Sequence, residues 1–397
     1  MPEAVIVDAV RTPTGRAIKG SLRHVRADDL AAVPLKALVD RNPEVDFSQT
    51  VDIMMGCGFP NGEQGYNIGR NAALLAGIDH HVPATSVNRF CASSLQTLRM
   101  AFHAIAAGEG DQYIAAGTEA VSRFPPYPPF DANAQLDGSE GAPYNVYIPM
   151  GLTAENVAER CSITREQQDE WAVTSQTRAV DAQASGHFDK EIVPVDTPAA
   201  TETDKEGNEV QVAAATVTKD DGPRPGTTLE KLGALPPAFK EGGTVTAGNA
   251  CPLNDGAAAV LVMSAERAAE LGLKPRARIV ASAVAAIRPE IMGLGPIPAV
   301  EKVLKQAGMT LDDIDIVELN EAFAAQVVPC LQEWGIDPET LNPFGGAIAL
   351  GHPFGQTGAR IMTTLLNDLE TLDKTFGLET MCVAGGMGQA MIVERLN

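Results

Sequence analysis

The 397-residue chain has no run of about 20 uninterrupted apolar residues, which is the length that a membrane-spanning helix needs. Its first residues, Met1 to Asp8, have no basic segment of the kind that opens a secretory signal, and they look like a first strand. We therefore expect no signal peptide, no membrane span and a cytoplasmic location.

Basic residues are scarce. The chain has 30 Lys and Arg against 51 Asp and Glu, which gives a formal net charge of −21. Nucleic-acid affinity depends largely on Lys and Arg that neutralise phosphates, so a nucleic-acid partner is not expected. The same charge opposes any anionic small ligand, and a site for one requires a local patch of basic side chains or backbone amides.

The six cysteines form no C-x-x-C pair and no short secreted framework; they lie at positions 57, 91, 161, 251, 330 and 382. We expect no metal site, and the simplest interpretation is six reduced thiols, most of them small buried side chains. No G-x-G-x-x-G follows the first strand, which argues against a nicotinamide dehydrogenase.

The first 120 residues alternate strand-like and helix-like segments, which indicates an α/β layered domain. The predicted segments are strands at Ala4–Val10, Val51–Cys57, Ala84–Asn88 and Asp111–Gly117, and helices at Asp28–Arg41 (with Asp28 as N-cap), Asn67–Gly77 and Cys91–Ala107.

The middle of the chain has a different character. Phe124–Tyr147 contains four prolines between residues 125 and 129 and is predicted to be irregular. Thr153–Arg160 and Thr164–Ser185 are predicted helices, the second with a capping box formed by Thr164 and Gln167. Residues 196–250 are polar with little periodicity. The region resembles an insertion, after which alternation resumes at Ala257–Ser264.

A weak internal repeat pairs the two halves. The segment that contains Asp52 resembles the one that contains Asp315, and the same offset places Cys91 opposite Phe354, each where a helix is expected to begin. Two similar α/β units that face each other would form a site from both.

Four segments carry candidate chemistry. In the first, a short strand runs into a helix at Cys91, where free amides and the positive helix end are expected to lower the thiol pKa. The alternative is a buried structural cysteine at a tight turn. In the second, a glycine-rich run surrounds His352, which is a general base or oxyanion donor, or else a helix cap.

The third segment, from Glu318 to Ala324, contains Asn320, which either holds a water or an oxyanion or caps the following helix. In the fourth, a predicted strand carries Cys382 into a glycine-rich turn, as a second thiol for acid–base chemistry or as a core cysteine before a hairpin. Each segment is weak evidence alone, and together the four specify one class of enzyme.

These motifs, in this order, resemble the thiolase family over essentially the whole chain. The resembling segments are Cys91 to Gln96, Asn320 to Phe323, Gly351 to Pro353 and Cys382 to Gly388. The resemblance implies an α/β fold with two similar halves in a five-layer αβαβα arrangement and an inserted loop domain. The implied division is an N-terminal half of residues 1–120 plus 251–272, a CoA-covering loop domain of residues 121–250 and a C-terminal half of residues 273–397.

The resemblance also implies a ping-pong reaction with Cys91, His352, Cys382 and Asn320 as catalytic residues. The backbone amides of Cys91 and Ala384 would hold an oxyanion. It implies no permanently bound cofactor, with coenzyme A and its thioesters as substrates. The implied CoA contacts are Arg224, Ala247, Gly248, Ala250, Cys251, Met150 and Phe323.

Some positions depart from the family pattern. Cys251 stands where many members have a serine, and Ala384 replaces a common glycine, which requires a negative φ there. Pro149, before Met150, stands where biosynthetic members often carry a histidine. Together with the Gly-His-Pro-Phe-Gly run, this favours the degradative β-oxidation branch.

The favoured function is therefore CoA-dependent cleavage of 3-ketoacyl-CoA to acetyl-CoA and a shortened acyl-CoA. The alternatives are condensation of two acetyl-CoA molecules, a noncatalytic acyl-CoA-binding protein and a condensing enzyme that acts on a carrier protein; the presence of Cys91, His352 and Cys382 argues against the last two. The family also implies a homodimer or homotetramer and allows a β-oxidation multienzyme partner.

Overall fold

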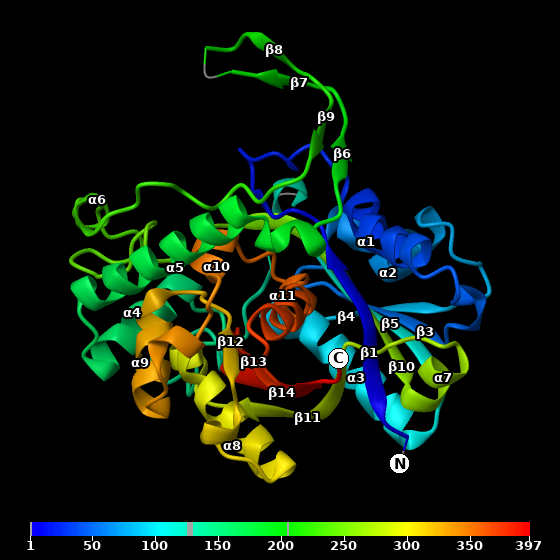
Figure 1. Cartoon of the computed structure of the whole chain (residues 1–397). Coiled ribbons are helices and arrows are strands. Elements are labelled where there is room, and N and C mark those ends of the chain that lie inside the picture. Colours follow the sequence, from blue (N-terminus) through cyan, green and yellow to red (C-terminus); the bar gives the residue numbers. More distant parts are fainter. Residues whose placement is uncertain (1, 125–129, 205) are drawn as a thin grey trace.

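The computed structural model describes residues 2–124, 130–204 and 206–397; the proline-rich run predicted at 125–129 lies outside them. Figure 1 shows an α/β fold around a large mixed sheet. The strands of this sheet are β1 (Ala4–Arg11), β2 (Gly15–Arg16), β3 (Asp52–Gly56), β4 (Ala84–Val87), β5 (Gln112–Ala120), β10 (Asn254–Ser264), β11 (Ala277–Ala286), β12 (Ile316–Leu319), β13 (Phe376–Val383) and β14 (Met387–Arg395).

Helices cover the outer faces of the sheet and also lie between its two halves (Figure 1). They are α1 (Ala27–Arg41), α2 (Ile68–Leu75), α3 (Ser93–Ala107), α4 (Met150–Cys161), α5 (Arg165–Ser185), α6 (Leu229–Gly233), α7 (Ala265–Glu270), α8 (Pro296–Ala307), α9 (Ala324–Trp334), α10 (Ala347–Leu350) and α11 (Thr357–Thr371). The predicted N-cap Asp28 is wrong, because α1 begins one residue earlier and its N-cap position is Arg26.

The sheet has two halves. The first has the strand order β1-β10-β5-β3-β4, and the second has the order β12-β13-β14-β11. They meet where β1 pairs with β11 over two residues, Val5 with Arg278 and Ile6 with Ala277. The strong twist of sheets allows the halves to turn their faces toward each other across a shared layer of helices.

The alternation of side chains along each strand generates five layers. In β3, Ile53 and Met55 face the outer helices α1 and α2, whereas Met54 faces the central helices. In β14, Met391 faces the central helices and Ile392 faces the other outer layer, which contains α8 and α9. The order is therefore helices, sheet, helices, sheet, helices, as the family resemblance implied.

The central layer consists of α3 and α11, which are the helices that the internal repeat pairs. Each has 15 residues, and their apolar side chains, including Leu95, Leu98, Ile361 and Leu365, belong to the same core cluster. Both helices start at the same end of this layer, since Gly358 packs on the backbone of Leu95. The segments before the two helices therefore meet.

The middle of the chain contributes no strand to the main sheet in its described part. It supplies α4, α5 and α6 and two small hairpins, which pair β6 (Val195–Thr197) with β9 (Ala215–Val217) and β7 (Ala200–Thr203) with β8 (Glu209–Val212). The second hairpin projects as an arm (Figure 1). The capping box of Thr164 and Gln167 is confirmed. The three-domain division stays a prediction.

The helices of the described residues include none that is both long enough and apolar enough to cross a membrane.

Candidate active site

Cys91 lies in the turn between β4 and α3. A 3-10 turn, Phe90–Ala92, precedes α3, so the α-helix starts at Ser93, two residues later than predicted. Phe90 has a φ of 44°, which is uncommon for a bulky residue, and the Asn88 side chain accepts a hydrogen bond from its amide at 2.7 Å. Such backbone strain is concentrated at functional sites. The turn leaves Cys91 8% exposed.

The amides of Cys91 and Ala384 both donate hydrogen bonds toward the Cys91 sulfur, and these bonds lower the thiol pKa. Burial has the larger effect and raises the pKa of Cys91 to about 12. The prediction of a lowered pKa is therefore wrong. The sulfur is a thiol at neutral pH and needs a base, while the two amides are positioned to hold an oxyanion there.

Cys382 is fully buried at the end of β13, and the chain turns at once into β14. Burial raises the pKa of Cys382 well above its ordinary value, and the neighbouring sulfurs of Cys91, Cys330 and Cys251 raise it further. The turn residues Gly385 and Gly386 both have a φ of 80°, whereas Ala384 does not have a positive φ. Alanine is therefore tolerated there without strain.

His352 has a defined tautomer. The Thr357 hydroxyl donates to the Pro353 carbonyl at 2.7 Å, so it accepts a hydrogen bond from His352 Nδ1 at 2.6 Å. His352 Nε2 then carries the lone pair and faces the Asn320 side-chain amide at 3.3 Å. Burial, with a smaller effect from the Arg360 charge, lowers the pKa of His352 to about 3. The ring is a neutral acceptor at physiological pH.

Asn320 does not cap a helix, since α9 starts four residues later at Ala324. Its backbone is held between Thr380 and Gln326, and its buried Oδ1 has no hydrogen-bond partner within the described chain. His352 Nε2 bonds Asn320 rather than Cys91. Catalytic hydrogen bonds are often long or absent before substrate is bound.

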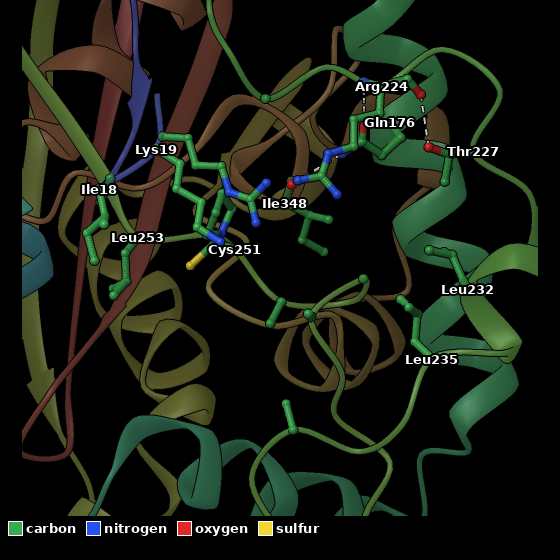
Figure 2. A pocket seen from close by; sticks show the side chains of 18 of the residues that line it. Ile18, Lys19, Gln176, Arg224, Thr227, Leu232, Leu235, Cys251, Leu253 and Ile348 are labelled. Carbon is green, nitrogen blue, oxygen red and sulfur yellow. Dashed lines mark hydrogen bonds between the residues drawn. The ribbon is translucent and has the colours of Figure 1, made fainter. Parts of the chain in front are cut away.

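A cavity of about 360 Å³ is lined in part by Cys251, which is close enough to Cys382 to raise the pKa of that thiol. Five of the seven predicted CoA contacts line it: Arg224, Ala247, Gly248, Ala250 and Cys251. Figure 2 shows Lys19 and Arg224 on opposite sides of the cavity, with the end of the Lys19 side chain near Cys251. The other two predicted contacts do not line it: Phe323 packs behind Ala250, and Met150 lies against the same core cluster, which also contains Cys382. This cluster joins the wall of the cavity to the second cysteine.

Two cations at the mouth were not predicted. Arg16 and Lys19 line the cavity with Arg224, and among the described residues none of the three side chains forms an ion pair. Arg16 lowers the pKa of Arg224, although burial of Arg224 is the larger cause. An acidic chain thus places three uncompensated positive charges around one opening. The signal in the sequence was a basic pair, Arg16 and Lys19, in a chain that is otherwise poor in such residues.

Glu119, at the end of β5, was also not predicted. Its buried carboxylate accepts hydrogen bonds from the amides of Gly58, Phe59 and Gly355 and from the Gln64 side chain, at 2.7–3.2 Å. Burial raises the pKa of Glu119, and these bonds lower it in part. Glu119 joins the loop after β3 to the loop before α11, on the side of the site where Cys91 lies.

One cluster in the described residues has the spacing of a metal site, and it is exposed: Asp79, His80 and His81, after α2. It contains none of the predicted catalytic residues.

Comparisons with known proteins cover the whole chain. Residues 4–266 match the family described as "Thiolase, N-terminal domain", and residues 273–395 match "Thiolase, C-terminal domain". The chain is 49% identical to a protein of Aliivibrio salmonicida named 3-ketoacyl-CoA thiolase and 48% identical to one of Acinetobacter baylyi named beta-ketoadipyl-CoA thiolase, covering 100% of each chain. The crystal structure of the Bacillus anthracis acetyl-CoA acetyltransferase is similar with a TM-score of 0.88 and 37% identity, over 100% of this chain and 99% of that one.

Proposed function

The chain belongs to the thiolase family, and from this premise we propose that it is a degradative acyltransferase. It cleaves 3-ketoacyl-CoA with free CoA and releases acetyl-CoA and an acyl-CoA that is two carbons shorter. The observation that carries this proposal is the environment of Cys91. The buried thiol of Cys91 receives two backbone amides, and Cys91 lies close enough to a second buried thiol, Cys382, to raise the pKa of Cys382. Cleavage requires these parts: a nucleophile, an oxyanion site and an acid.

In the first half-reaction, His352 Nε2 accepts the proton of Cys91, and the thiolate attacks the 3-keto carbon. The bond between C2 and C3 breaks, and its electron pair moves to C2 as the enolate of acetyl-CoA. Cys382 donates its proton to C2, which its raised pKa favours because the thiol is protonated at rest. The amides of Cys91 and Ala384 hold the oxyanion on the attacked carbon.

At the start of the second half-reaction Cys382 is a thiolate, because it has given its proton to C2. It now accepts a proton from the thiol of an incoming CoA. The CoA thiolate attacks the acyl group on Cys91, and the Cys91 sulfur leaves and regains its proton from His352. The enolate oxygen that forms in the first half-reaction is held by His352 and by a water molecule that Asn320 binds.

The cavity lined by Arg224, Ala247, Gly248, Ala250 and Cys251 is the proposed CoA channel. The three cations at its mouth supply the local positive patch that an anionic nucleotide needs on a chain of net charge −21. Phe323 and Met150 support the wall rather than line it. No permanently bound cofactor is part of this proposal.

Thiolysis of a series of 3-ketoacyl-CoA substrates, from C4 to C16, tests the proposal. We expect CoA-dependent loss of the enolate absorbance and a higher kcat/KM for the longer substrates. Activity confined to acetoacetyl-CoA would replace the degradative function with acetyl-CoA acetyltransferase activity. No thiolysis of any substrate would contradict the enzyme assignment.

We also propose that the chain forms a homodimer or a homotetramer. Strand β4 ends the sheet and pairs only with β3 in the described residues, and its four residues are half-buried. Beside it, Leu74, Leu75 and Tyr66 are 47%, 54% and 97% exposed. A strand edge flanked by apolar side chains suits association with a second copy. The six cysteines are free, which suits a cytoplasmic location.

A further inference from the structure

Three buried titratable side chains that the proposed reaction does not use are hydrogen-bonded in a row. Glu318 lies on β12 and Asp368 on α11, and their side chains share a hydrogen bond. His187, in the 3-10 turn His187–Lys190 that follows α5, bonds Asp368 Oδ1 through its Nε2 at 2.9 Å. Glu318 and Asp368 are 1% and 0% exposed. The row therefore joins the middle of the chain to the second half of the sheet.

The charges around this row are unbalanced. Glu379 on β13 stands directly opposite Glu318 in the register of the two parallel strands, so both side chains lie on one face of the sheet. Arg360 on α11 is the cation that acts on both Glu318 and Asp368, and its Nε and Nη1 have no hydrogen-bond partner within the described chain. Three carboxylates around one guanidinium are too costly in a protein interior. The other charged groups that act on the row are Glu191, Arg11, Lys190 and Glu321.

The hydrogen bond between the two carboxyls shows where a proton is kept. An ionised carboxyl can only accept, so one member of the pair must be a neutral acid. Burial raises the pKa of both Glu318 and Asp368, and their shared bond raises the pKa of Glu318 and lowers that of Asp368. Glu318 is then the donor and Asp368 the carboxylate. Burial lowers the pKa of His187, so its neutral ring donates to Asp368 from Nε2.

Glu318 anchors the strand that leads to Asn320. Strand β12 has four residues and lies at the edge of the sheet, where it pairs with β13 alone among the described strands. Residues two apart face the same side of a strand, so Glu318 and Asn320 both point toward the central layer, as Ile316 does. The bond from Glu318 to α11 therefore holds the end of a weakly paired strand.

The other end of the row reaches the segment that carries His352. The His187 ring stacks on the Phe344 ring, with centroids 3.7 Å apart and planes 10° apart. Phe344 directly precedes the glycine-rich run that contains His352. One row of hydrogen bonds thus contacts both segments whose side chains meet at Asn320 and His352.

We propose that Glu318 is held as a neutral acid whose proton bonds Asp368, and that Glu318 is thereby a positioning residue for Asn320. The positioning role rests on the proposed function, because it concerns the side chain that binds the water at the enolate oxygen. The location of the proton does not rest on that function.

A pair of variants of unchanged shape tests where the proton lies. Glu318→Gln exchanges one neutral donor for another, whereas Asp368→Asn removes the carboxylate that accepts two bonds and balances Arg360. In urea unfolding at pH 7 we expect the folding equilibrium constant to be nearly unchanged in Glu318→Gln and to fall by at least about a hundredfold in Asp368→Asn. Glu241→Gln, at an exposed position, is the matched control. Equal losses in the two variants, or a larger loss in Glu318→Gln, would overturn the inference.

Infrared spectroscopy detects the proton without a folding measurement, so it decides the question even if Asp368→Asn does not fold. A protonated carboxyl group has a carbonyl band that a carboxylate lacks. In D₂O at neutral pD we expect this band in the wild type and a weaker one in Glu318→Gln, where other buried carboxyls such as Glu379 keep the remainder. A band of equal strength in both proteins, or no band in either, would overturn the inference.

Glu318→Ala tests the positioning role. We expect kcat for thiolysis of acetoacetyl-CoA to fall about tenfold with KM for CoA nearly constant, and Glu318→Gln to restore kcat. In the absence of free CoA, the final yield of acetyl group on Cys91 per chain should equal that of the wild type, because the reaction is slower but every chain is competent. A yield that falls in step with kcat would mean a loss of folded protein, and would overturn the positioning role.

The outcomes separate this inference from the proposed function. Absence of thiolysis in the wild type would overturn the proposed function and the positioning role together. The unfolding and infrared measurements would still decide where the proton lies, because neither depends on activity.

Discussion

Protonation of His352 links the stability of the fold to the state of the proposed catalytic base. The pKa of His352 is held down to about 3 in the folded chain, by burial first and by the Arg360 charge second. In the unfolded chain a histidine titrates near 6.5. Between these values the unfolded chain binds a proton that the folded chain does not, so the free energy of unfolding falls as pH decreases from about 6.5 toward 3.

The magnitude follows from the width of this window. Each pH unit below 6.5 costs about 1.4 kcal/mol, so the contribution of His352 at pH 5 is a loss of about 2 kcal/mol relative to pH 7. The ring is 2% exposed, so solvent screening does not reduce this figure greatly. Other buried groups also titrate, and the measurement must isolate this one.

His352→Asn isolates it, because the variant keeps the other titrating groups and loses only the imidazole. Urea unfolding of both proteins at pH 7 and pH 5 gives the stability difference at each pH, and any cavity effect cancels between the two. We expect the advantage of the wild type over the variant to shrink by about 2 kcal/mol at pH 5. An unchanged difference would refute the argument, as would an acidic limb of the wild-type kcat/KM that is centred near pH 6.5.

Three further predictions follow from single contacts. Glu119→Gln directs an amide NH₂ group at N–H donors and should lower the free energy of unfolding by about 2–3 kcal/mol, measured by urea melts; an equally stable variant would contradict the four-bond arrangement. Thr357→Val removes the acceptor for His352 Nδ1–H and should reduce kcat by about tenfold with KM nearly constant, whereas Thr357→Ser should restore it. Arg16→Ala and Lys19→Ala should each raise KM for CoA by at most about fivefold and leave kcat unchanged. The rise in KM should be smaller in 1 M salt, because salt screens the attraction between the cations and CoA. A rise that does not depend on salt would argue against charge attraction.

The alternation of strands and helices could be predicted because it depends on local patterns, whereas the five layers followed from the family resemblance. Alternating apolar segments marked β1, β3 and β5, and the repeat identified the paired central helices α3 and α11. The short strands β7 and β8 could not be predicted. Their side chains are mostly exposed, so no buried face imposes an alternation of apolar and polar residues on them.

The motifs predicted the candidate catalytic residues, whose roles stay predictions, but the motifs could not predict the protonation states of these residues. A helix start near Cys91 suggested a low pKa, and the outcome depends on burial, which only the packed layers determine. The positioning residues were missed for a related reason. Glu119 acts on Gly355, which lies 236 positions away in the chain, and no local pattern connects them. Thr357 bonds His352 across only five positions, yet a lone threonine at a helix start is an ordinary residue.

Trapping of the acyl group tests the central claim most directly. The full-length protein is incubated with 3-ketodecanoyl-CoA in the absence of free CoA, and the intact mass and the modified peptide are determined. The account predicts one octanoyl group per chain on Cys91, its release as octanoyl-CoA when CoA is added, and no adduct in Cys91→Ala. An adduct on Cys251 or Cys382, or equal labelling of the Cys91→Ala variant, would contradict it.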